Sequence, residues 1–222
     1  MGRIFLRSVL NCRYIKIPHL GDFIFMKLLL HPLPVRIFHW IMFFSVSYLV
    51  ATGLYLHDPW SGLPYGVVRK THTLAGIILL LNFLGQIYYY LATGKYTEII
   101  LTRHDWPNLR SFFRYALFIT EHHPNYGRYN PGQKALFTMW ALAVILSGMA
   151  ALPYVFSEYA SWLGRPFGGL MGTRIVFYGI MMFFLATIPL HLYLAFTEEP
   201  AKLQAMFSGY VKKEPKCKPS QE

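Results

Sequence analysis

Four stretches of this chain are each long and apolar enough to cross a lipid bilayer as a helix. They contain no aspartate or glutamate and cover approximately residues 36–57, 70–92, 133–156 and 172–197. A bilayer is spanned by roughly 20 predominantly apolar residues. Because every backbone polar group must be satisfied internally within lipid, such stretches have to be helical. The sequence therefore predicts an all-α fold, a bundle of four transmembrane helices.

The overall composition agrees with a membrane protein. Only 14% of the residues are charged and 55% are hydrophobic, whereas about a quarter of the residues of a soluble domain are charged. The two cysteines, Cys12 and Cys217, lie near opposite ends of the chain and belong to no CxxC motif. The sequence therefore does not support an iron–sulfur cluster, a zinc knuckle or a covalently attached haem.

The basic residues predict how the chain is oriented. Of 21 lysines and arginines, seventeen lie before or at the start of the first span, between the second and third spans, or after the fourth. By the positive-inside rule, both termini (N-in/C-in) and the long loop 93–132 then lie in the cytoplasm of a bacterial or archaeal cell. The net charge of +11 is accordingly interpreted as a topology signal and an attraction to lipid headgroups, not as a nucleic-acid footprint.

We divide the chain into three parts. Residues 1–25 are an N-terminal extension, or an artefact of start-site choice, since they make a poor signal peptide and Met26 is a plausible start. Residues 26–210 form the membrane domain, and residues 211–222 a basic cytoplasmic tail. Within the long loop, residues 108–120 alternate cationic and aromatic side chains at helical spacing. This pattern predicts a short helix, either in the membrane interface or packed on the loop itself.

Two histidines lie at one depth in the predicted bundle. His39 and His191 are near the cytoplasmic ends of the first and fourth spans, where an ionisable ring is costly unless it faces the protein or binds something. Such a pair can hold a haem between helices. Zinc is the competing interpretation, but it prefers more ligands, and no acidic or cysteine partner lies at that depth. His72 and His57 lie at the outer level, about 27 Å from His39 at the rise of a helix.

Several motifs together resemble the b-type cytochrome (gamma) subunits of formate dehydrogenases. The resemblance covers about residues 30–210 and rests on PVRIFHW (34–40), TG (52–53), HTLAG (72–76), YNPGQK (129–134) and HLYLAF (191–196). The cytochrome b subunits of nickel–iron hydrogenases and thiosulfate reductases are similar, less closely.

The resemblance implies a function as well as a fold. It implies a subunit that anchors a catalytic and an iron–sulfur subunit, carries two haems b and passes electrons to menaquinone or ubiquinone near the cytoplasmic side. The main expectation is the haem-b subunit of a formate dehydrogenase. The alternatives are a structural anchor with reduced haem content, or the corresponding subunit of a hydrogenase or thiosulfate reductase.

Carried over by position, the resemblance assigns His39 and His191 to the cytoplasmic-side haem and His72 to the outer haem. The partner of His72 should lie fourteen residues before His191, and that residue is Phe177. Phenylalanine cannot bind iron, so the outer haem is absent, five-coordinate, or bound by a relocated histidine such as His57. We therefore expect one haem b per chain, bound by His39 and His191.

The resemblance also suggests a quinone site. Asn130, Gly132 and Gln133 match it by position, and the amide side chains can form hydrogen bonds with a quinone carbonyl. The alternative is a simple turn in which Gln133 caps the following helix.

Overall fold

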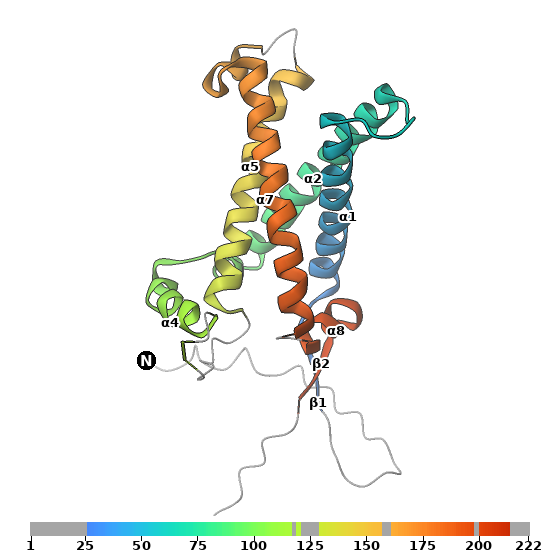
Figure 1. Cartoon of the computed structure of the whole chain (residues 1–222). Coiled ribbons are helices and arrows are strands. Elements are labelled where there is room, and N and C mark those ends of the chain that lie inside the picture. Colours follow the sequence, from blue (N-terminus) through green and yellow to red (C-terminus); the bar gives the residue numbers. More distant parts are fainter. Residues whose placement is uncertain (1–25, 117–118, 121–128, 157–160, 198–199, 214–222) are drawn as a thin grey trace, which may run out of the picture. The chain divides into compact units, whose positions relative to one another are not determined.

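The computed structural model describes residues 26–116, 119–120, 129–156, 161–197 and 200–213 (Figure 1). The chain divides into two compact units. We call Trp40–Ile188 the central unit, and Met1–His39 together with Pro189–Glu222 the terminal unit. The predicted extension 1–25 and the tail beyond residue 213 lie outside the described residues.

Four long helices dominate the chain (Figure 1). They are α1 (Leu33–His57), α2 (Tyr65–Ala92), α5 (Pro131–Val155) and α7 (Gly169–Thr197). All four are long and apolar enough to cross a membrane, which confirms the predicted spans. Each helix begins a few residues before its apolar stretch, since residues such as Pro131 are well suited to a first helical turn.

A small apolar core joins the helices of the central unit. Its buried members come from all four helices: Val46, Leu79, Phe83, Ala143, Val144 and Phe184. Large apolar side chains also point outward, and Leu81, Leu142 and Ile175 are each more than half exposed. A soluble bundle would place polar residues there, whereas an apolar exterior is what contact with lipid requires.

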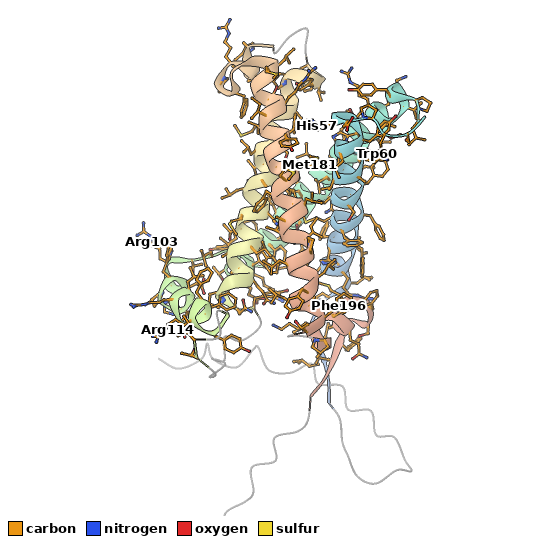
Figure 2. The ribbon with its side chains drawn as sticks, in the orientation of Figure 1. His57, Trp60, Arg103, Arg114, Met181 and Phe196 are labelled. Atoms are coloured by element: carbon orange, nitrogen blue, oxygen red, sulfur yellow. The ribbon has the colours of Figure 1, made fainter. Side chains whose placement is uncertain are left out.

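The described residues of the connection between α2 and α5 are largely helical. Among them are three short helical elements: α3 (Tyr96–Ile99), η1 (Arg103–Asp105) and α4 (Trp106–Ala116). Helix α4 confirms the helix predicted within residues 108–120, and it packs on the start of α5. Figure 2 shows Arg103 and Arg114 extending outward from this region, and both are exposed. The location of α4 in the membrane interface stays a prediction. A further 3-10 helix, η2 (Ser161–Phe167), precedes α7.

The terminal unit contains a two-stranded ribbon that the all-α prediction missed. Strands β1 (Met26–Leu29) and β2 (Tyr210–Lys213) pair antiparallel, with Met26 opposite Lys213 (Figure 1). Four-residue strands are too short for alternation to stand out in the sequence. The predicted boundary between membrane domain and tail, at residue 211, consequently falls inside β2.

Helix α8 (Pro200–Ser208) links α7 to this ribbon. Gly209 follows it with a φ of +86°, the left-handed conformation in which glycine commonly ends a helix. The guanidinium of Arg36 donates from Nε to the Met206 carbonyl at 3.1 Å and from a terminal nitrogen to the Phe207 carbonyl. Arg36 therefore ties the start of α1 to the last turn of α8.

Candidate functional site

The predicted pair His39 and His191 lies within the terminal unit. His39 follows Arg36 by one turn of α1, and His191 is in the last third of α7. Both side chains are partly buried, and they lie near enough for a charge on His191 to act on His39. The two imidazoles therefore lie within electrostatic range of each other in the terminal unit. The Arg36 hydrogen bonds hold in place the part of α1 that carries His39.

The donor set at this pair fits a haem better than a bare metal ion. Within the described part of the chain, no three side chains of His, Cys, Asp or Glu converge. Structural zinc takes four ligands, and catalytic zinc at least three protein ligands. Haem iron needs only its axial ligands from the protein, and helical bundles supply them from facing helices. His39 and His191 are two such ligands on two helices.

His72, in α2, is held through one of its ring nitrogens. Its Nδ1 lies 2.8 Å from Thr52 Oγ1, and Thr52 donates its own hydrogen to the Tyr48 carbonyl at 2.6 Å. Because a carbonyl oxygen can only accept, the single hydroxyl hydrogen is used there, and the His72 Nδ1–H is the donor to Thr52. Nε2 is then the ring nitrogen that carries no hydrogen, and a ring nitrogen in this state can coordinate a metal.

Gly53 allows close packing beside the His72 ring. A Cβ atom at Gly53 would lie 3.2 Å from Met181 Sδ and 3.8 Å from His72 Cε1. An added Cβ would therefore crowd the sulfur, whereas its distance to the imidazole would be an ordinary van der Waals contact. Met181 lies on the side of α7 that faces α1, as Figure 2 shows. The glycine thus lets the Met181 side chain pack close to the backbone of α1 at the level of His72.

Phe177 and His57 have other ring contacts. The Phe177 ring centroid lies 6.1 Å from that of Tyr154 in α5. His57, exposed at the end of α1 (Figure 2), has its ring 4.9 Å from that of Tyr178. The hypothesis that His57 replaces the missing ligand stays a prediction.

The three residues of the predicted quinone site form the start of α5. Asn130 is the N-cap residue: its Oδ1 accepts the Gln133 backbone N–H at 2.7 Å, and Gln133 Oε1 accepts the Asn130 backbone N–H at 3.1 Å. This is a capping box, as the alternative interpretation of the motif expected. A Cβ at Gly132 would overlap the Phe112 ring of α4. Binding of a quinone by these residues stays a prediction.

Asp105 fixes the loop to the same end of α5. Its carboxylate accepts the Thr102 backbone N–H at 2.9 Å and the Thr102 hydroxyl at 2.7 Å, and it lies 2.9 Å from Lys134 Nζ. Burial raises the pKa of this carboxyl, but the Thr102 hydrogen bonds and the Lys134 ammonium together outweigh burial and lower the pKa below its ordinary value. Asp105 is therefore ionised at neutral pH, and its bond with Lys134 is a salt bridge.

Paired histidines on different helices of a four-helix membrane protein are typical of membrane cytochromes. Residues 30–209 match the family described as prokaryotic cytochrome b561, and the chain belongs to this family. It is therefore a multi-pass prokaryotic membrane protein with an electron-transfer role, and the family implies b-type haem.

The chain is also similar to several proteins named probable Ni/Fe-hydrogenase B-type cytochrome subunit. The one from Azotobacter vinelandii is 26% identical over an alignment of 205 positions, which covers 80% of this chain and 84% of that protein. The one from Cupriavidus necator gives the same identity and coverage. The one from Rhodobacter capsulatus is 25% identical over an alignment of 126 positions, which covers 50% of this chain and 48% of that protein. These names favour the hydrogenase alternative, and the formate dehydrogenase prediction gains no support from them.

Sequence reasoning did not assign a role to two residues beside His72. Thr52 entered only as part of the TG motif, and Met181 was not singled out. Met181 follows Phe177 by four residues and so lies on the same face of α7. The hydrogen bond of Thr52 with His72 could be recognised only from the structure, because it depends on how α1 and α2 lie next to each other.

Proposed function

We propose that this chain is the haem-b membrane subunit of a Ni/Fe hydrogenase. In this function it carries electrons between the hydrogenase's catalytic and iron–sulfur subunits and the membrane quinone pool. The names of the relatives support the hydrogenase assignment. The observation that carries the electron-transfer function is the pair His39 and His191, two partly buried imidazoles from different helices.

His39 and His191 would be the axial ligands of this haem. Bound haem b supplies a one-electron carrier whose potential is set by its ligands and surroundings. The chain contributes the orientation of the two rings and an apolar environment. Arg36 supports the orientation of the His39 ring, because its hydrogen bonds to the end of α8 hold the segment of α1 that carries His39.

The proposed electron acceptor is menaquinone or ubiquinone, with Asn130, Gly132 and Gln133 as the binding region. The support is the position of the YNPGQK motif and its amide side chains, which can donate to a quinone carbonyl. Gly132 would contribute the close approach of α4 to α5 rather than a polar contact.

The first test removes each proposed ligand in turn. His39→Ala or His191→Ala should abolish the low-spin spectrum of this haem, because each removes one of its two axial bonds. His104→Ala is the matched control, since His104 is exposed in η1, and it should keep the full spectrum. Retention of all low-spin haem in both ligand variants would overturn the proposal.

The second test concerns the partner. In membranes that contain the chain with its native partner enzyme, hydrogen should reduce the haem and formate should not. Reduction by formate alone would return the assignment to formate dehydrogenase. Purified chain without any haem would favour the structural-anchor alternative.

A further inference from the structure

We propose that the exposed side of α4 binds the headgroups of anionic phospholipids, in the leaflet of the membrane in which α5 begins. This side of the helix consists of Trp106, Arg110, Phe113 and Arg114, and we call it the α4 surface. The proposal goes beyond the proposed function, because it depends neither on a haem nor on a quinone.

The first argument is the depth of α4 in the membrane. The Phe112 ring of α4 lies against Gly132, near the start of α5, a helix long and apolar enough to cross the bilayer. Figure 1 shows α4 beside this end of α5. The ends of a spanning helix lie at the level of the lipid headgroups. A helix packed on the first turn of such a span therefore meets the headgroups as well.

The second argument is the pattern of exposed side chains on α4. Trp106 is 63% exposed and Phe113 is 55% exposed, and a separation of seven residues places both on one side of the helix. Arg110 is exposed too, and it neighbours both rings, four residues after Trp106 and three before Phe113. Helices that lie in a membrane interface combine aromatic side chains, which enter the boundary of the acyl chains, with basic side chains that stay among the headgroups.

The third argument is a positive charge that the chain does not balance. Arg110 and Arg114 are exposed and one helical turn apart, a spacing at which like charges destabilise a helix. Within the part of the chain that the structure describes, neither arginine forms an ion pair. Asp105, directly before α4, already binds Thr102 and Lys134. An anionic group from outside the chain would therefore stabilise the α4 surface.

A phospholipid satisfies both halves of this surface. Its phosphate accepts charge-assisted hydrogen bonds from the two guanidinium groups, and its acyl chains cover the rings of Trp106 and Phe113. An acidic protein would pair with the arginines alone, and it would have to replace lipid beside the end of a membrane span. The observations therefore favour the lipid.

The experiment uses the purified full-length chain in nanodiscs of phosphatidylcholine and follows Trp106 fluorescence. The difference between the chain and its Trp106→Phe variant isolates this residue among the five tryptophans. Lipids with brominated acyl chains quench a tryptophan that they contact. Brominated phosphatidylglycerol should quench Trp106 at a lower fraction of the lipid than brominated phosphatidylcholine does.

Arg110→Gln/Arg114→Gln should reduce this preference for phosphatidylglycerol about 30-fold, since each basic residue near an anionic surface contributes about 1 kcal/mol and 1.4 kcal/mol is a factor of ten. Lys95→Gln/Arg103→Gln is the matched control. It removes two exposed charges from the same loop but leaves α4 unchanged, and it should keep most of the preference. Glutamine retains the helix propensity of arginine, and thermal unfolding in phosphatidylcholine should be the same for all chains.

Three results would overturn the proposal. If neither brominated lipid quenches Trp106, α4 faces water, and an acidic protein becomes the better partner. If both quench it equally in the unmodified chain, α4 lies in the interface without binding anionic headgroups. If the control loses the preference as fully as Arg110→Gln/Arg114→Gln, the diffuse charge of the loop attracts the lipid. The first two results need no substitution of an arginine, and all three leave the proposed haem at His39 and His191 untouched.

Discussion

Asn130 and Gln133 are tied to each other, and this limits what they can offer a ligand. The amide oxygen of each side chain accepts the backbone N–H of the other residue. A quinone carbonyl is itself an acceptor, so only the amide NH₂ groups can donate to it. At the scale of single residues, the quinone hypothesis therefore concerns the nitrogens of the two amides, while the oxygens stabilise the helix.

This division can be tested with variants that keep the cap. Asn130→Asp and Gln133→Glu retain the capping oxygens and place a negative charge at a helix N-terminus, which is favourable, but they remove the NH₂ donors. We expect unchanged thermal stability and slower reoxidation of the reduced haem by a menaquinone analogue. Asn130→Ala removes the cap as well and should lower the stability by about 1 kcal/mol.

The measurements are thermal unfolding in detergent and stopped-flow absorbance of the haem. If the aspartate and glutamate variants are reoxidised as fast as the unmodified chain, the motif is a helix cap and nothing more. The sequence contained both interpretations of these residues. It could not choose between them, because a capping box and a quinone contact use different atoms of the same side chains.

At the scale of helices, the contact of α4 with α5 depends on one glycine. The Phe112 ring of α4 occupies the space in which a side chain at Gly132 would begin. The nearby salt bridge between Asp105 and Lys134, at 2.9 Å, fixes the preceding η1 element to the same helix. The contact with Phe112 therefore explains why a glycine stands at position 132, without any contact with a quinone.

Gly132→Ala should displace α4, because the added methyl group overlaps the Phe112 ring. Overpacking of this kind costs about 1–3 kcal/mol, and we expect a lower unfolding temperature with full haem content. Phe112→Ala removes the ring with which the added methyl group overlaps. Gly132→Ala should therefore lower the stability less in the Phe112→Ala variant than in the unmodified chain. The check is a double-mutant cycle on thermal unfolding, and strictly additive effects would show that the two residues do not interact.

The elements differ in how far the sequence could predict them. The four spans follow from apolar length alone, and α4 follows from its alternating cationic and aromatic residues. The ribbon of β1 and β2 joins segments near opposite ends of the chain, and its four-residue strands carry no strong local pattern. The bond between Thr52 and His72 depends on how two helices are aligned, which local sequence does not encode.

At the scale of the whole molecule, the basic residues predict which side of the membrane the proposed haem ligands face. The proposed ligands His39 and His191 belong to the terminal unit, which also contains the ribbon of β1 and β2. The side of the membrane on which this ribbon lies is therefore the side of the proposed ligand pair. Seventeen of the 21 basic residues flank the spans on that side, which predicts the cytoplasm.

Reporter fusions test this orientation directly. A fluorescent protein that matures only in the cytoplasm should be bright when fused after Glu222, because the basic flanks retain that end inside. Alkaline phosphatase, which is active only outside the cytoplasm, should be inactive after Glu222 but active after Gly62, in the connection between α1 and α2. Immunoblots should show equal amounts of each fusion protein. The opposite pattern would place the proposed ligand pair His39 and His191 at the outer surface. Electrons leaving the proposed haem would then meet quinone on that side.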